Sequence, residues 1–118
     1  MHLAAEDCGN AMLFHIIPHH LDGQVADQVV FEAIDNARED RDIYLIDLKQ
    51  VTAIDSMGLS ALVTITKSLG RGRRVELCAL SPRVHKVFRL TRMEGVFKIH
   101  SSVDAALHAN FATRPAAM

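Results

Sequence analysis

The chain is poor in the residues on which several common classes of protein depend. It contains no tryptophan, and aromatic residues make up only 5% of its 118 residues. This scarcity argues against an aromatic platform on which sugars or unpaired bases would stack. Cysteine occurs only twice, at Cys8 and Cys78, without a C-x-x-C pair. We interpret both as reduced thiols rather than as a disulfide framework.

An excess of one charge and long apolar runs are missing as well. The formal net charge of -1 gives no bulk attraction to nucleic acid or to an anionic membrane. No apolar run approaches the ~20 residues that span a bilayer. The amino-terminal stretch, with its acids Glu6 and Asp7, lacks the apolar segment of a signal peptide. We therefore expect a soluble, cytoplasmic protein that does not bind nucleic acid or membranes directly.

The length and composition suit one globular domain. Hydrophobic residues make up 49% of the chain and charged residues 23%, which is enough apolar material for a core. We expect a leader or weak edge strand over residues 1–10, the domain itself over 11–110, and a flexible tail over 111–118.

The hydrophobic pattern alternates between strand-like and helix-like spacing. Short apolar or β-branched runs predict strands at 12–17, 43–48, 75–80 and 96–99. Helical spacing predicts four helices, whose expected buried residues are Val25, Val29, Ala33, Ile34 and Ala37 in the first, Leu59, Leu62, Val63, Thr66 and Leu69 in the second, Val84, Val87, Phe88 and Leu90 in the third, and Val103, Ala106 and Leu107 in the last. The expected amino-terminal caps of the first and third helices are Asp22 and Ser81, and the last helix is expected to start at Ser102.

This alternation predicts an α/β domain with a four- or five-stranded, mostly parallel (mixed) sheet and four helices. The run from Ile43 to Leu48 is interrupted only by Asp47, which is typical of a strand buried on both faces. Right-handed crossovers between parallel strands place the loops that follow the strands along one rim of the sheet.

The most informative stretch is D-L-K-Q-V-T-A-I-D-S-M-G-L-S-A-L, residues 47–62. It predicts a buried strand, a short loop, and a helix that opens at Asp55 and Ser56, where small polar residues are good caps. The first turn of a helix carries free N–H groups and a partial positive charge. We therefore expect Ser56 to be exposed on the rim, at a place that tolerates a phosphate.

The pattern D-L-x-x-V-x-x-I-D-S-x-G-L-x-A-L resembles the signature of STAS domains, above all those of the anti-sigma factor antagonists. Residues 77–84, 88–91 and 97–107 resemble later strands and helices of the same family. The resemblance covers residues 40–108 well and 11–39 weakly. It implies a single STAS-like domain.

In that family, the serine that matches Ser56 is phosphorylated by a partner that is both a kinase and an anti-sigma factor. The resemblance implies an anti-sigma factor antagonist that docks this serine kinase while Ser56 is unmodified, and that a phosphatase resets. The expected partner-binding residues are Asp22, Asp55, Ser56, Met57, Gly58 and Ser60. The sequence departs from the family's usual residues at His19, Met57 and Ser60.

Two alternatives remain open for the same stretch. Ser56, or Asp55 before it, caps a helix and does nothing more. Alternatively, the chain is a non-phosphorylated STAS subunit of a larger stress-signalling or lipid-transport assembly. A hydrolase is disfavoured, because Ile54 stands where the G-x-S-x-G motif requires its first glycine.

Other motifs have plain structural interpretations. His19 and His20 lack a suitably spaced third ligand for a metal. The stretch Arg71–Arg74 suits the end of a helix and lacks the G-K-[ST] ending of a phosphate loop. A receiver domain would need a pair of acids where Pro18-His19-His20 stands. We therefore expect no enzymatic activity, no metal and no cofactor.

Overall fold

Five strands form the central sheet. They are β1 (Leu3–Cys8), β2 (Ala11–Ile16), β4 (Ile43–Asp47), β6 (Arg74–Cys78) and β7 (Ile99–His100). Their order across the sheet is β1-β2-β4-β6-β7, with β1 antiparallel to β2 and all other neighbours parallel. The structure is a computed structural model and describes residues 1–111. It confirms the predicted α/β fold with a mostly parallel sheet and four helices.

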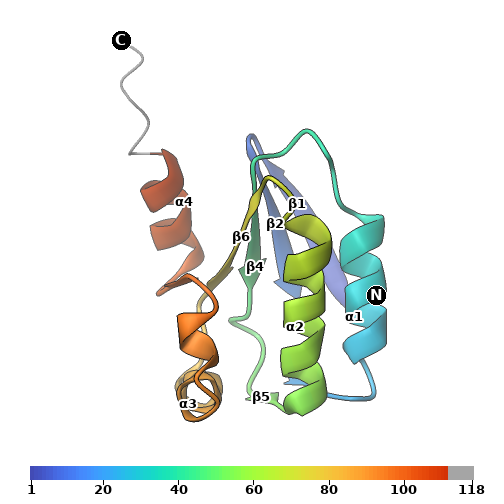
Figure 1. The fold of residues 1–118 in the computed structure, drawn as a ribbon, viewed down its shortest axis with the longest axis vertical. Coiled ribbons are helices and arrows are strands. Elements are labelled where there is room, and N and C mark those ends of the chain that lie inside the picture. Colours follow the sequence, from blue (N-terminus) through green and yellow to red (C-terminus); the bar gives the residue numbers. More distant parts are fainter. Residues whose placement is uncertain (112–118) are drawn as a thin grey trace.

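The helices lie on both sides of this sheet. They are α1 (Ala26–Asp35), α2 (Ser56–Leu69), α3 (Pro82–Leu90) and α4 (Val103–Phe111), with a 3₁₀ turn, η1, at Met93–Gly95. Figure 1 shows α1 and α2 on one side of the sheet, α4 on the other, and α3 near the end of the sheet where β5 lies. A second, two-stranded parallel sheet pairs β3 (His20–Leu21) with β5 (Ala53–Ile54).

Each face of the central sheet has its own hydrophobic core. On the side of α1 and α2, the buried side chains include Phe14, Tyr44 and Ile46, and the rings of Phe14 and Tyr44 are 5.6 Å apart. On the side of α4, a smaller core contains Leu13 and Leu45. All five residues of β4 are buried, as the predicted two-sided burial of this strand requires.

Two predicted core positions are wrong. The side chains of Ile34 and Leu90 are 46% and 74% exposed. Helical spacing alone did not decide which edge of each apolar stripe reaches the sheet. Helix α3 contacts the core through Phe88, and Leu90, its last residue, lies beyond that contact. In α2 the prediction omitted Ile65, which is fully buried, whereas Val63 is only partly so.

The predicted strand over 96–99 is also wrong in most of its length. Arg92 adopts a left-handed backbone (φ 61°), and the 3₁₀ turn that follows closes with a hydrogen bond from the Val96 N–H to the Met93 carbonyl. Phe97 is buried against Phe88, with ring centroids 5.9 Å apart. The chain therefore becomes extended only at Ile99, where it joins β6.

The two ends of the chain differ in how far the structure describes them. Residues 3–8 form the edge strand β1 and pair along their whole length with β2. The expected flexible tail, residues 111–118, begins one residue too early, because Phe111 is the last residue of α4. Its other residues, 112–118, lie outside the described part of the chain. Both cysteines are free thiols. Within residues 1–111, no helix is long and apolar enough to cross a membrane.

Candidate functional site

The small sheet formed by β3 and β5 builds the platform of the candidate site. Leu21 pairs with Ile54, and the N–H of Thr52 donates to the carbonyl of His19 at 2.7 Å. This pairing aligns two loops that are about thirty residues apart in the sequence. Asp22 and Asp55 immediately follow the paired strands, so their backbones leave the platform side by side.

Asp55 is the amino-terminal cap of α2, and Ser56 is the first helical residue. The Asp55 carboxylate accepts a hydrogen bond from the Gly58 N–H at 2.9 Å and a longer one from the Gly23 N–H at 3.4 Å. Its own N–H donates to the Leu21 carbonyl at 3.3 Å. Ser56 is exposed and is not the capping residue. Its hydroxyl therefore lies on the surface, beside the positive end of a 14-residue helix.

Gly58 holds the start of α2 against the platform. A Cβ added at this position would lie 2.1 Å from the Leu21 carbonyl oxygen and 2.7 Å from Cγ1 of Ile54. Only glycine permits so close an approach of helix and strand. Gly58 is buried, so it supports the predicted partner surface by positioning Ser56. The sequence prediction grouped it with the surface residues and did not show this packing role.

Asp22 does not cap the first helix, contrary to the prediction. Helix α1 begins later, at Ala26, after Val25, which makes no side-chain cap. The Asp22 carboxylate instead accepts from the Gln24 N–H at 3.0 Å, and its carbonyl accepts from Ala26 N–H at 2.8 Å. Asp22 therefore shapes the turn between β3 and α1 and stays partly exposed on the rim.

Met57 and Ser60 complete the predicted surface. The Met57 side chain is 51% exposed, which is high for a large apolar residue. Ser60 is exposed one helical turn after Ser56, so both hydroxyls lie on the same side of α2. The structure thus brings five of the six predicted residues to one rim: Asp22, Asp55, Ser56, Met57 and Ser60.

A shallow hollow of about 250 Å³ lies next to this surface. It is lined by His20, Asp22, Ala53, Ile54 and Asp55. Among residues 1–111 no group of three or more histidine, cysteine, aspartate or glutamate side chains could hold a metal ion. The polar side chains that line the hollow are the carboxylates of Asp22 and Asp55 and the imidazole of His20.

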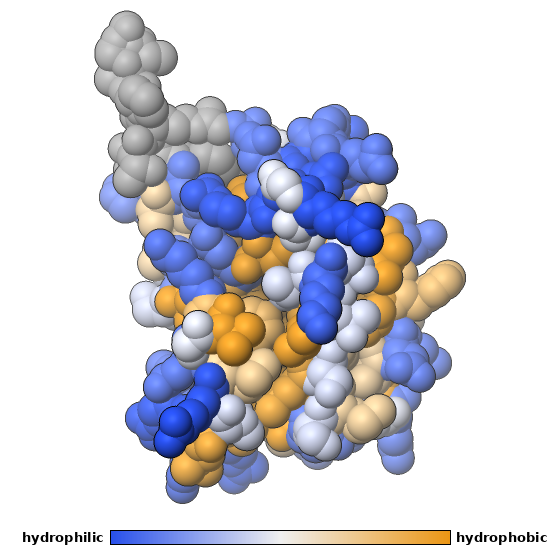
Figure 2. Space-filling model, in the orientation of Figure 1, coloured by the Kyte–Doolittle hydropathy of each residue, from blue (hydrophilic) through white to orange (hydrophobic). Residues whose placement is uncertain are grey.

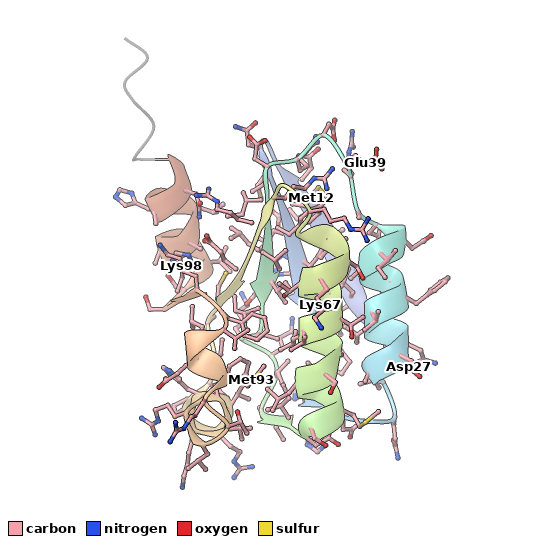
Figure 3. All side chains as sticks on the ribbon, in the orientation of Figure 1. Met12, Asp27, Glu39, Lys67, Met93 and Lys98 are labelled. Atoms are coloured by element: carbon pink, nitrogen blue, oxygen red, sulfur yellow. The ribbon has the colours of Figure 1, made fainter. Side chains whose placement is uncertain are left out.

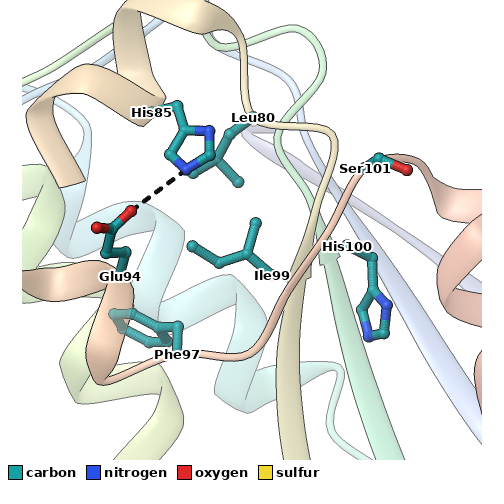
Figure 4. Close-up of a pocket in the computed structure, with 7 residues that line it drawn as sticks. All are labelled: Leu80, His85, Glu94, Phe97, Ile99, His100 and Ser101. Atoms are coloured by element: carbon teal, nitrogen blue, oxygen red, sulfur yellow. Dashed lines mark ion pairs between the residues drawn. The ribbon is translucent and has the colours of Figure 1, made fainter. Parts of the chain in front are cut away.

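A larger hollow of about 500 Å³ lies elsewhere, between α3, η1 and β7 (Figure 4). His85 and Glu94 face each other across its mouth, with Nε2 3.5 Å from a carboxylate oxygen. His100 also lines it, but its Nε2 is bound to the buried Glu76 carboxylate at 2.7 Å. None of the predicted site residues lines this hollow.

The sequence prediction missed a polar cluster on the face of the sheet that carries α4. The His15 ring lies between two carboxylates, 2.7 Å from Asp47 and 2.9 Å from Glu6. Burial disfavours the charged ring, but hydrogen bonds to Glu6 and Asp47 outweigh it and raise the pKa of His15. The only sequence signal for this cluster was the acid within the apolar run of β4.

Cys78 is chemically quiet. Burial, and then the nearby carboxylates of Asp47 and Glu76, raise the pKa of its thiol to about 12. The thiolate is the reactive form of cysteine, so this side chain acts as a small apolar core residue.

Comparison with known proteins gives one family and a set of similar folds. The family model of the STAS domain matches residues 3–106. A STAS domain protein from Planctomyces limnophilus, an anti-sigma-factor antagonist, is 21% identical, with a TM-score of 0.80 over 91% of this chain and 96% of that one.

Two further proteins have similar structures at lower identity. SpoIIAA, an anti-sigma factor antagonist, is 17% identical in its unphosphorylated form, with a TM-score of 0.73 over 96% of this chain and 99% of that one. Its phosphorylated form, from Bacillus, gives a TM-score of 0.64 at 17% identity over 92% and 98% of the two chains. Part of the murine anion transporter Slc26a9 matches at 15% identity and a TM-score of 0.74, over 89% of this chain and 18% of that one. At these identities, the likeness shows the fold.

Proposed function

Because the chain belongs to the STAS domain family, we propose that it is a phosphorylation-regulated binding protein acting as an anti-sigma factor antagonist. The single observation that carries this proposal is the position of Ser56. Its hydroxyl is exposed at the first residue of α2, while Asp55 does the capping. A residue whose hydroxyl is not needed for the helix cap is available for modification.

The proposed partner is a serine kinase that is also an anti-sigma factor. It docks on the rim formed by Asp22, Asp55, Ser56, Met57 and Ser60 while Ser56 is unmodified. The kinase supplies ATP: the Ser56 oxygen attacks the γ-phosphorus, the bond from that phosphorus to the β–γ bridging oxygen breaks, and ADP leaves. The hydroxyl proton passes to a base of the kinase. The chain itself acts as substrate and ligand rather than as an enzyme.

Phosphorylation would change the rim more than the fold. It adds about −1.5 to −2 charges at Ser56. The N-terminus of α2 favours negative charge, so the helix tolerates the phosphate. The neighbouring carboxylate of Asp55 and that of Asp22 make the same rim strongly negative. A partner shaped for a neutral hydroxyl loses several kcal/mol when it meets this charge.

The magnitude is sufficient for a switch. A loss of about 3–4 kcal/mol weakens binding by two to three powers of ten, which dissociates a micromolar complex. A phosphatase that removes the phosphate restores docking. While the chain is phosphorylated and cannot dock, the anti-sigma factor is free to bind its sigma factor. Removal of the phosphate therefore releases the sigma factor again.

The test compares forms of the full chain against the partner kinase, recovered by pull-down from native lysate and then purified. We expect Ser56→Ala to dock but to resist phosphorylation, and Ser56→Asp and the phosphorylated protein to dock more weakly. Thr64→Asp is the matched control, because Thr64 is exposed on the same helix two turns further on. Equal affinity of wild type, Ser56→Asp and phosphorylated protein would overturn the proposal.

A second candidate is a non-phosphorylated STAS subunit of a larger stress-signalling or lipid-transport assembly. The observation that favours it is the similar fold of one part of the Slc26a9 anion transporter, where the match covers 18% of that chain. In that case the pull-down recovers membrane-transport subunits rather than a kinase, and Ser56→Asp has no more effect than Thr64→Asp.

A further inference from the structure

The segment from α3 to the start of β7, residues 82–98, holds an unusual share of the positive charge. It contains five of the chain's 13 lysine and arginine residues but only one of its 14 acids, Glu94. The rest of the chain therefore carries eight basic and 13 acidic residues. All five cations are exposed: Arg83, Lys86, Arg89, Arg92 and Lys98. Figure 2 shows strongly hydrophilic side chains gathered over α3, next to apolar ones. The molecule is thus electrically polarised despite its net charge of -1.

The cations surround an apolar side chain that the fold leaves uncovered. Arg83, Lys86 and Leu90 are spaced by three and four residues, so they lie on one face of α3. The opposite face, with Val84 and Phe88, is buried in the core. Leu90 is 74% exposed, and Val96, just after η1, is 62% exposed. Large aliphatic side chains at these exposures contribute nothing to the core, although they are well placed to contact another molecule.

The basic face of α3, defined as Arg83, Lys86 and Leu90, adjoins the candidate site. Helix α3 packs directly against β5, the strand that leads into Asp55 and Ser56. Figure 1 shows α3 and β5 together at the same end of the molecule. A partner protein held at the Ser56 rim is therefore close enough to extend onto α3.

We propose that the basic face of α3 docks an acidic, amphipathic helical segment of a partner protein. The proposal deepens the proposed function, on which it rests for the identity of that partner. Carboxylates of the segment pair with Arg83 and Lys86, while one of its apolar side chains covers Leu90. An amphipathic helix that binds along such a face makes its contacts through residues spaced three and four apart.

The geometry favours a protein segment over a membrane. A helix that lies in a bilayer surface inserts a continuous apolar face. The continuous apolar face of α3 is already occupied, because Val84 and Phe88 are buried in the domain. Nucleic acid is disfavoured because the remainder of the chain has five more acids than lysines and arginines.

The test uses a fluorescein-labelled synthetic helix with leucine on one face and glutamate on the other. A second peptide has the same composition in shuffled order. Amide shifts in NMR spectra locate the contact, and fluorescence anisotropy at low and higher salt measures affinity. We expect the shifts to fall within residues 83–98, and affinity to decrease as salt screens the exposed charges.

Variants separate this surface from general charge effects. We expect the double variant Arg83→Glu, Lys86→Glu to weaken peptide binding about tenfold or more, since it places like charges together. Leu90→Ser should weaken it several-fold and leave the thermal unfolding midpoint unchanged. Lys67→Glu is the control, because Lys67 lies on the outer side of α2, away from α3 (Figure 3). It should leave the affinity within about twofold of wild type.

Four results with the peptide would each overturn the proposal. They are equal binding of the shuffled peptide, equal weakening by Lys67→Glu, shifts spread over the whole chain, or binding of anionic vesicles or a DNA duplex in preference to the peptide. The Ser56 switch is judged separately by the affinity for the kinase. If Ser56→Asp weakens that complex while Arg83→Glu, Lys86→Glu does not, the proposal for α3 fails and the proposed function stands. If only the α3 variants weaken it, the Ser56 switch fails instead.

Discussion

The backbone of Gly58 lies so close to the carbonyl oxygen of Leu21 that no larger residue fits between them. A Cβ at position 58 would be 2.1 Å from that oxygen, well inside van der Waals contact. The contact joins the first turn of α2 to β3, and so joins the segment that carries Ser56 to the segment that leads into Asp22.

Gly58→Ala should therefore destabilise the protein, although alanine favours helix by ~1 kcal/mol over glycine. The added methyl group meets backbone, which cannot rotate away, and we expect a net loss of about 1–3 kcal/mol in the free energy of unfolding. Urea unfolding measures it. Gly95→Ala is the control, because a Cβ there meets nothing within 4 Å. Equal stability of the two variants would show that the helix moves away from Leu21 without loss.

Asp55→Ala should cost about 1 kcal/mol, because it removes the oxygen that accepts from the Gly58 N–H. Asp55→Asn keeps a capping oxygen and removes the charge, so its stability should stay near wild type. Comparing both variants in urea unfolding and in kinase binding separates the cap from the charge. A partner affinity lost in Asp55→Asn at unchanged stability would assign Asp55 to the docking surface.

Leu62→Ala and Leu90→Ala compare the same truncation at a buried and at an exposed leucine. Leu62 is fully buried in α2, and its truncation should cost about 2–5 kcal/mol. Leu90 is 74% exposed on α3, and the same change there should alter stability by less than about 0.5 kcal/mol. Chemical denaturation of both variants tests the assignment. A loss below about 0.5 kcal/mol for Leu62→Ala would mean that this face of α2 does not pack on the sheet.

The His15 cluster should make stability fall as pH rises. In the folded state, contacts with Asp47 and Glu6 raise the pKa of His15 above its value in the unfolded chain. The folded state therefore binds the proton more tightly, and the stabilisation is complete below the unfolded pKa of about 6.5. It is lost as pH rises through the raised folded pKa.

His15→Gln removes this titration while keeping a side chain that can form hydrogen bonds. The difference in unfolding free energy between wild type and His15→Gln should shrink from about pH 5.5 to pH 8.5. His108→Gln is the control, since it removes a histidine outside this cluster. A constant difference for His15→Gln across that range would mean that the ring does not change its charge on folding.

Much of the fold and part of the site followed from local sequence signals. The caps of α2 and α3, the buried strand β4 and the exposed hydroxyl of Ser56 depend on a few neighbouring residues. Their physical causes are short-range, because a cap satisfies the N–H groups of its own first turn. The alternation of strands and helices likewise predicted the parallel sheet.

Only the tertiary structure decided which residues far apart in sequence meet. The pairing of β3 with β5, the His15–Asp47 contact and the fit of Gly58 against Leu21 each join segments more than thirty residues apart. Periodicity likewise placed Ile34 and Leu90 on the buried faces of their helices, although the fold leaves both side chains exposed. The sequence by itself determined the four helices, the strands β2, β4 and β6, and the serine at the start of α2. The packing of elements determined the rim around that serine, because burial and close approach depend on distances that no local pattern encodes.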